Sequence, residues 1–351
     1  MTRRLLMTAD AVGGVWQYAT ELARGLSPHG WSVDLALLGP GPAPTTDLSV
    51  IETGLPLDWL AEDPAEVAAG ARSLADLARG YDAVQVNQPA LAIADYPCPV
   101  VTVAHSCVAT WWAAVEHGPL PPSLAWQAAL TGRGLAKADV AVAPSAAFAA
   151  AVARTYALRR APLVVHNGRS GAAGRDTHAC VFTAGRLWDR GKDIATLDRA
   201  AARLSLPFEA AGPLTGPHGE SVAVSHLTPL GRLGDAQVAR RLAARPIFAS
   251  AARYEPFGLA VLEAALAGCA LVLSDIPTFR ELWEGAATFV APGDDAAFAA
   301  AIEALASDPA SRSARGTRAA TRAATFTPDR MAAGMAAILD RLAPARETQA
   351  A

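Results

Sequence analysis

The sequence predicts an α/β fold made of two successive units, each built around a parallel sheet. Short apolar segments alternate along the chain with longer Ala-rich amphipathic segments, a pattern typical of βαβ units. A turn-rich stretch at residues 167–174 interrupts this alternation near the middle, and a second alternation follows it. The length of 351 residues is also sufficient for two domains.

We expect the first domain to span residues 1–168, because strand and helix patterns alternate throughout it. The strands are expected at 5–7, 32–38, 83–86, 100–103, 140–143 and 163–165. Helical periodicity indicates helices at 14–27, 64–79, 123–137 and 145–156.

The second domain is expected to span residues 175–325, where the alternation resumes. Its strands are expected at 181–184, 208–211, 224–227, 247–249, 270–273 and 287–290. Its helices are expected at 192–204, 234–243, 258–267, 277–283 and 294–306. A last helix, around 328–343, and a short tail make up the C-terminal segment 326–351.

The composition limits the classes of function. Apolar residues make up 52% of the chain and charged residues 18%, which favours two buried cores over disorder. The formal net charge of −3 gives no indication of a nucleic-acid partner, and no apolar run approaches the roughly 20 residues of a membrane span. Four scattered cysteines are typical of a reducing compartment and argue against a zinc site. We therefore expect a cytoplasmic protein with at most peripheral membrane contact.

The most informative segment carries two carboxylates, Glu255 and Glu263, with seven residues between them. Glu255 is expected on the loop after a strand, and Glu263 about one turn into the next helix. At the start of that helix, the N–H groups of Phe257, Gly258 and Leu259 are expected to lack helical partners and to favour an anionic phosphate. The two acids can accept hydrogen bonds from two sets of hydroxyls. A nucleotide sugar offers this combination, because its diphosphate lies between a sugar and a ribose.

These residues resemble the donor site of the retaining glycosyltransferases with the GT-B fold, family 4 in particular (glycosyl transferases group 1). The resemblance extends over nearly the whole chain and rests on the order of its motifs: Gly13-Gly14, His105, 164–168, 185–193, the two-Glu segment and 292–294. It implies two Rossmann-like domains that face an interdomain cleft, with the last helix crossing back to the N-terminal domain. It also implies a glycosyltransferase that acts as a hexosyltransferase.

Gly13 and Gly14 precede a helix, and a plain tight turn is the simplest interpretation of such a pair. The resemblance instead implies a glycine-rich loop over the donor phosphates. It also implies that Arg186 and Lys192 bind the diphosphate, with Arg190 as a nearby competitor. Only two of the 30 basic residues are lysines, and the others are arginines. A lysine that occurs against this bias indicates a position that favours a compact ammonium, and Lys192 lies within one of the motifs.

For the two acids, the resemblance implies that Glu255 lies near the donor sugar hydroxyls and that Glu263 binds the nucleotide ribose. A glycosidase acid/base pair is a poorer interpretation, because one loop and the helix after it cannot flank a glycosidic bond from opposite sides. His105 can bind the transferred sugar or assist acceptor deprotonation, although a lone histidine is often structural. Trp111 and Trp112 are expected on a loop after His105, where they either stack on an acceptor or join the core.

The resemblance therefore implies transfer of a hexose from a nucleoside-diphosphate sugar to a hydroxyl acceptor, with retention of configuration. The acceptor would be a glycan, a lipid-linked sugar or a small molecule, as in polysaccharide biosynthesis. We expect no metal and no cofactor, since the nucleotide sugar is itself the co-substrate and two cations can stabilise the leaving diphosphate. The alternatives are a nucleotide-sugar 2-epimerase-like isomerase and a non-catalytic nucleotide-sugar-binding subunit.

Overall fold

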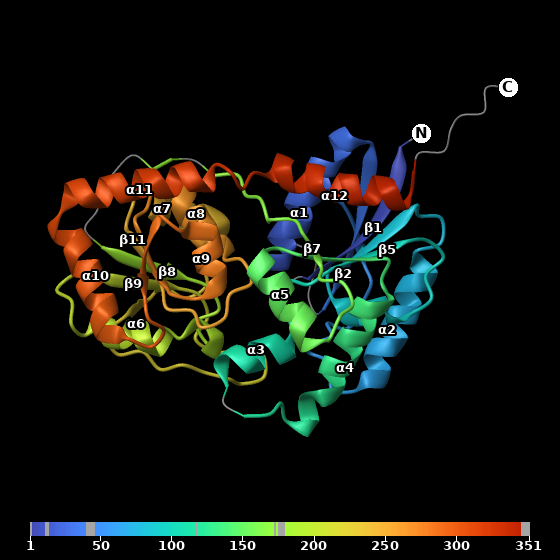
Figure 1. Ribbon diagram of the computed structural model, residues 1–351, viewed down its shortest axis with the longest axis horizontal. Coiled ribbons are helices and arrows are strands. Elements are labelled where there is room, and N and C mark those ends of the chain that lie inside the picture. Colours follow the sequence, from blue (N-terminus) through green and yellow to red (C-terminus); the bar gives the residue numbers. More distant parts are fainter. Residues whose placement is uncertain are drawn as a thin grey trace. The chain divides into compact units, whose positions relative to one another are not determined.

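The computed structural model describes residues 2–10, 14–39, 46–116, 118–171, 173–174 and 180–344. The chain divides into two compact units, which Figure 1 colours mainly blue to green and yellow to orange. One unit comprises Met1–Gly168 together with Pro328–Ala351, and the other comprises Arg169–Thr327.

The first unit contains a parallel sheet of seven strands within the described residues, in the order β3-β2-β1-β4-β5-β6-β7. The strands are β1 (Arg3–Asp10), β2 (Trp31–Leu38), β3 (Ser49–Glu52), β4 (Ala83–Val86), β5 (Val100–Val103), β6 (Val140–Ala143) and β7 (Leu163–Val164). The helices are α1 (Gly14–Leu26), α2 (Pro64–Leu77), α3 (Val108–Val115), α4 (Pro122–Lys137), α5 (Ala146–Thr155) and α12 (Pro328–Leu342).

Both faces of this sheet are buried. Leu5 and Met7 of β1 join a core with Leu22 of α1, whereas Leu6 between them joins a second core with Leu74 of α2. This alternation follows from the two-residue period of a strand, and covering both faces explains why the strands are almost continuously apolar.

The C-terminal helix α12 packs against α1 within this unit (Figure 1). A Cβ placed on Gly25 of α1 would come within 2.7 Å of the Cβ of Ala332, so the glycine permits close contact between the helices. At the far end of α12, Asp340 pairs with Arg3 at 2.6 Å and accepts a hydrogen bond from Trp31 Nε1 at 3.0 Å. These contacts explain why residues after 327 belong to the first unit.

The second unit contains a six-stranded parallel sheet in the order β10-β9-β8-β11-β12-β13, again within the described residues. The strands are β8 (Val181–Ala184), β9 (Phe208–Ala211), β10 (Thr228–Pro229), β11 (Ile247–Ser250), β12 (Leu271–Ser274) and β13 (Ala287–Val290). The helices are α6 (Ile194–Ala201), α7 (Asp235–Ala243), α8 (Leu259–Leu266), α9 (Pro277–Trp283), α10 (Asp295–Ser307) and α11 (Pro309–Ala323). Two Rossmann-like domains are therefore confirmed.

Several elements differ from the sequence expectation. The strand expected at 224–227 is wrong, because pairing with β9 starts only at Thr228. Helix α11 was not anticipated, since it buries small residues instead of a stripe of large apolar ones. A Cβ on Gly316 would lie 2.2 Å from the carbonyl oxygen of Gly268, so α11 packs directly against backbone.

Each sheet has a point where the strand order reverses. In the first sheet β1 and β4 are neighbours, and in the second β8 and β11 are neighbours. Ligands of open α/β sheets bind at the carboxyl ends of strands at such points. No helix in the described part of the chain is both long and apolar enough to cross a membrane.

Candidate functional site

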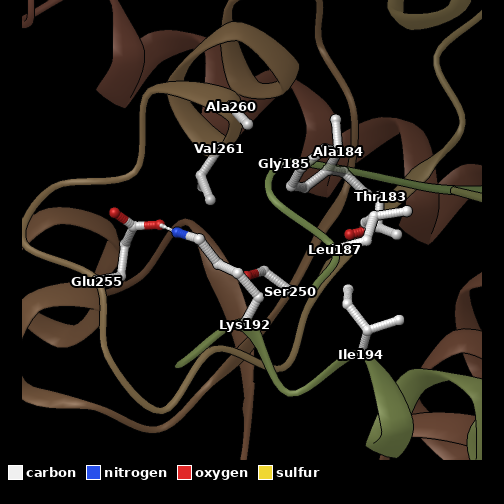
Figure 2. Close-up of a pocket in the computed structure, with 11 residues that line it drawn as sticks. Thr183, Ala184, Gly185, Leu187, Lys192, Ile194, Ser250, Glu255, Ala260 and Val261 are labelled. Carbon is white, nitrogen blue, oxygen red and sulfur yellow. Dashed lines mark hydrogen bonds and ion pairs between the residues drawn. The ribbon is translucent and has the colours of Figure 1, made fainter. Parts of the chain in front are cut away.

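A pocket in the second unit lies at the carboxyl ends of β8 and β11, where the strand order reverses (Figure 2). The last residues of these strands, Ala184 and Ser250, contribute to its wall. Lys192 and Glu255 supply its charged side chains, and they point toward each other across the pocket in Figure 2. Two of the residues proposed from the sequence thus meet in one pocket.

Lys192 is placed by a tight turn after β8. Asp189 begins the short 3-10 helix Arg190–Lys192, and its carboxylate accepts a hydrogen bond from the Gly191 N–H at 2.8 Å. The same carboxylate also accepts one from Arg186 at 3.2 Å. Asp189 is buried, whereas the Arg186 side chain is 44% exposed. Arg186 lies between two pocket residues in the sequence but does not itself line the pocket.

Lys192 and Glu255 form an ion pair with 2.5 Å between Nζ and Oε2. Their side chains are only 20% and 16% exposed, so water screens the charges less than it would at the surface. An ammonium in this setting can bind an anionic phosphate, and the carboxylate can accept hydrogen bonds from hydroxyls.

The loops that carry these two side chains are tied together by their backbones. The N–H groups of Arg253 and Tyr254, just before Glu255, donate to the carbonyl oxygen of Gly191 at 2.9 and 3.2 Å. Arg253 Nε also donates to Asp193 Oδ2 at 2.8 Å. The loop after β11 therefore holds the loop after β8, and the spacing of Lys192 and Glu255 does not depend on their own contact alone.

Helix α8 begins directly after Gly258, which has a left-handed backbone with a φ of 92°. A Cβ at this position would come within 3.3 Å of Glu255 Cγ, so glycine also allows the acid to approach the helix start. The Phe257 side chain is buried and lies edge-on to Phe326 at 5.7 Å, so it belongs to the core. Leu259 is half-buried against the same core.

Glu263 does not line the pocket. Its Oε1 accepts a hydrogen bond from Arg169 Nε at 2.7 Å, and the two side chains are 24% and 14% exposed. A second, longer contact of 3.4 Å joins Arg169 Nη2 to the exposed Asp235. Arg169 was not singled out in the sequence, because it lies in a turn-rich stretch 94 positions from its partner.

His105 lies in the first unit, where a polar network follows the ends of β1, β4 and β5. The Asn87 amide donates to the carbonyl oxygen of Thr8 at 2.5 Å, so Asn87 Oδ1 is the acceptor for Gln85 Nε2 and for His105 Nε2, both at 3.1 Å. His105 therefore carries its proton on Nε2 and presents Nδ1 as an acceptor. Burial lowers the pKa of His105 to about 3, so the ring is neutral at pH 7.

The remaining proposed residues have varied positions. Gly14 is the exposed first residue of α1, whereas Gly13 lies outside the described residues. Trp111 and Trp112 are on α3 and not on a loop, so that expectation was wrong: the segment Val108–Val115 forms two helical turns. Within the described ranges, no three His, Cys, Asp or Glu side chains come together as a metal site requires.

Two family models match the chain. The model described as Glycosyltransferase Family 4 matches residues 12–169, and the one described as Glycosyl transferases group 1 matches residues 224–322. The first match falls in the first unit except for its last residue, Arg169, and the second match includes Glu255 and Glu263. A comparison with curated proteins found no match.

Solved structures with the same fold include several glycosyltransferases. A sucrose-phosphate synthase from Thermosynechococcus elongatus is 17% identical with a TM-score of 0.82, over 97% of this chain and 99% of that chain. WaaG, a glycosyltransferase involved in lipopolysaccharide biosynthesis, is 16% identical with a TM-score of 0.74, over 96% and 99% of the two chains. Anabaena Alr3699/HepE in complex with UDP-glucose is 19% identical with a TM-score of 0.73, over 97% and 100%.

Proposed function

Because this chain belongs to the family 4-like GT-B glycosyltransferases, we propose that it transfers a hexose from a nucleoside-diphosphate sugar to a hydroxyl acceptor with retention of configuration. The observation that carries the proposal is the Lys192–Glu255 pair in a pocket at the switch point of the second sheet. An ammonium and a carboxylate at this place suit a ligand with both a phosphate and hydroxyls.

Each charged group has a role in the proposed transfer. Lys192 and Arg186 stabilise the diphosphate as it leaves, together with the N–H groups at the start of α8. Glu255 orients the donor sugar through its hydroxyls, and Glu263 binds the ribose.

The transfer itself breaks the bond between C1 of the sugar and the diphosphate oxygen. The acceptor oxygen forms a bond to C1 on the same face, and its proton passes to the leaving diphosphate. Configuration is therefore retained without a covalent enzyme intermediate. Two cations can neutralise the negative charge that develops on the leaving group, so we propose that no metal ion takes part.

The donor class is also supported by a similar structure, since Alr3699/HepE was solved in complex with UDP-glucose. We propose a uridine, guanosine or adenosine diphosphate hexose as the donor. A glycan, a lipid-linked sugar or a small molecule is the proposed acceptor, as in polysaccharide biosynthesis. A cytoplasmic location fits four described cysteines that are not joined in disulfides.

A donor screen tests the proposal. Purified protein is incubated with UDP-, GDP- and ADP-hexoses, with and without a panel of hydroxyl acceptors, while release of the nucleoside diphosphate is measured. We expect acceptor-dependent release from one donor class, an unchanged rate with a chelator, and a product whose anomeric configuration by NMR matches the donor. A changed sugar without transfer would instead indicate an isomerase, and donor binding without release would indicate a non-catalytic subunit. A strict need for a divalent cation would contradict the two-cation mechanism.

A further inference from the structure

We infer that Arg169 is a positioning residue of the donor site, which holds the Glu263 carboxylate so that it can receive the ribose diol of the nucleoside diphosphate. This inference rests on the proposed function, because it assigns a partner to the residue that binds the ribose there. It adds to the site a residue from the segment that opens the second unit.

The contact between the two residues is a sheltered ion pair. Arg169 Nε lies 2.7 Å from Glu263 Oε1, and both side chains are mostly buried. Sheltered charges are screened less than surface charges, and a charge-assisted hydrogen bond is stronger than a neutral one. The pair is therefore suited to fixing the orientation of the Glu263 side chain.

The backbone around Arg169 contacts both the segment after α11 and the helix that carries Glu263. The Arg169 N–H donates to the carbonyl oxygen of Phe326 at 3.2 Å. Two residues further, a Cβ on Gly171 would lie 3.0 Å from the Cβ of Leu266, the last residue of α8. Arg169 thus reaches Glu263 from a backbone that is itself fixed, as a positioning residue requires.

The way Arg169 approaches leaves the acid able to bind hydroxyls. Arg169 Nε–H donates to Oε1 of the Glu263 carboxylate. A carboxylate has about four acceptor sites, so one such contact does not exhaust it. The outer nitrogen Nη2 is directed to Asp235, at 3.4 Å. Glu263 can therefore keep Arg169 and accept the diol together.

The test compares ligands that differ only in the ribose diol. Isothermal titration calorimetry measures the affinity of the wild type for UDP, GDP and ADP, and for the 2′,3′-dideoxy form of each. The pair containing the tightest binder is then measured with Arg169→Met and Arg169→Lys. The matched control is Arg241→Met, which removes another Arg–Glu pair of the second unit, joined to Glu209 at 2.6 Å, and neither residue of that pair lines the pocket.

We expect the wild type to prefer the ribonucleotide, and Arg169→Met to lose about tenfold in its affinity, equal to about 1.4 kcal/mol. Affinity for the dideoxy form should stay within about twofold, because that ligand makes no contact with Glu263. Arg169→Lys should recover part of the preference, since an ammonium can still pair with the carboxylate. Arg241→Met should behave as the wild type, and thermal unfolding should confirm that each variant is folded.

The outcomes separate this inference from the proposed function. An Arg169→Met variant that loses both ligands equally, or that still prefers the ribonucleotide as the wild type does, would overturn the positioning role. Tighter ribonucleotide binding by the variant would overturn it too, because Arg169 would then compete with the ribose. If the wild type binds none of the three nucleoside diphosphates, the proposed function fails first.

Discussion

Replacing Lys192 with methionine should reduce turnover far more than it reduces donor binding. Methionine keeps much of the length of the side chain but removes the ammonium that lies 2.5 Å from Glu255. Negative charge on the leaving diphosphate grows as the bond to the sugar breaks, so a cation beside it stabilises the transition state more than the bound donor. The loss should therefore appear mainly in kcat.

The size of the effect follows from the burial of the pair. Removing one preorganised donor from a developing oxyanion typically lowers kcat by about 10²–10³. Breaking a fully buried ion pair costs about 3–5 kcal/mol of stability, but these side chains retain 20% and 16% exposure, so we expect about 1–2 kcal/mol. The backbone bonds from Arg253 and Tyr254 to Gly191 remain, so the loops should keep their positions.

Initial rates of nucleoside diphosphate release, measured over a range of donor concentrations, separate kcat from KM. Arg190→Met is the matched control, because Arg190 is an exposed cation in the same turn that does not line the pocket. Glu255→Gln provides the opposite perturbation. It should lower turnover while leaving nucleoside diphosphate affinity unchanged or stronger, since the ammonium keeps its charge without an acid to pair with. The reasoning is refuted if Lys192→Met retains turnover within about tenfold of the wild type, or if Arg190→Met loses as much.

Three further substitutions test other parts of the site. Glu263→Ala should weaken nucleoside diphosphate binding at least about tenfold by calorimetry, because hydrogen bonds to a charged group contribute about 1.5–3 kcal/mol each; a change within about twofold would contradict ribose binding. Gly258→Ala should lower the free energy of unfolding by about 1–2 kcal/mol, since its φ is 92°. This loss of stability should exceed that of Gly219→Ala, because Gly219 has a similar φ of 85° but no atom within 4 Å of an added Cβ. Equal losses for the two variants would show that the atoms around Gly258 do not add to the cost of its φ. The wild type should lose stability relative to His105→Gln as the pH falls from 7 to 5 in chemical denaturation. The unfolded ring, with a pKa of 6.5, binds protons that the folded ring, with a pKa of about 3, does not; parallel pH profiles would refute this.

Much of the fold was predictable because its strands are short apolar segments bounded by glycine, proline and polar residues. Strands β4, β5, β6, β8, β9 and β13 have the bounds expected from the sequence. The departures arise where burial does not involve large apolar side chains. Helix α11 buries Gly316, Ala319 and Ala323 against α8 and nearby backbone, so no large apolar side chains mark its buried face in the sequence. Strand β10 has only two residues, too few for a two-residue period to be recognised.

The candidate site was predictable in its residue types but not in its pairings. The two glutamates, with seven residues between them, and the rare lysine can be recognised from the sequence alone. The loop or helix on which each lies follows from the strand and helix boundaries. Lys192 and Glu255, however, are 63 positions apart, and no local pattern indicates that they touch. Arg169 contacts Glu263 across 94 positions, in a stretch whose glycines indicate only turns. Contacts between distant loops depend on sheet order, which brings β8 beside β11.

The pairing of the charges explains why the site should favour an intact nucleotide sugar over its parts. Lys192 pairs with Glu255, and Arg186 pairs with Asp189, so each of the two cations proposed to bind the diphosphate already has an acid partner. A free phosphate must compete with Glu255 for the ammonium, whereas a nucleotide sugar also brings hydroxyls that can replace the ammonium as partners of the acid. A free sugar offers those hydroxyls but no anion for Lys192. Because leaving a sheltered charge unpaired is costly, only a ligand with both features satisfies the two groups together. The affinity for the intact donor should therefore exceed that expected from a separate sugar and nucleoside diphosphate, and Glu255→Gln should reduce this excess.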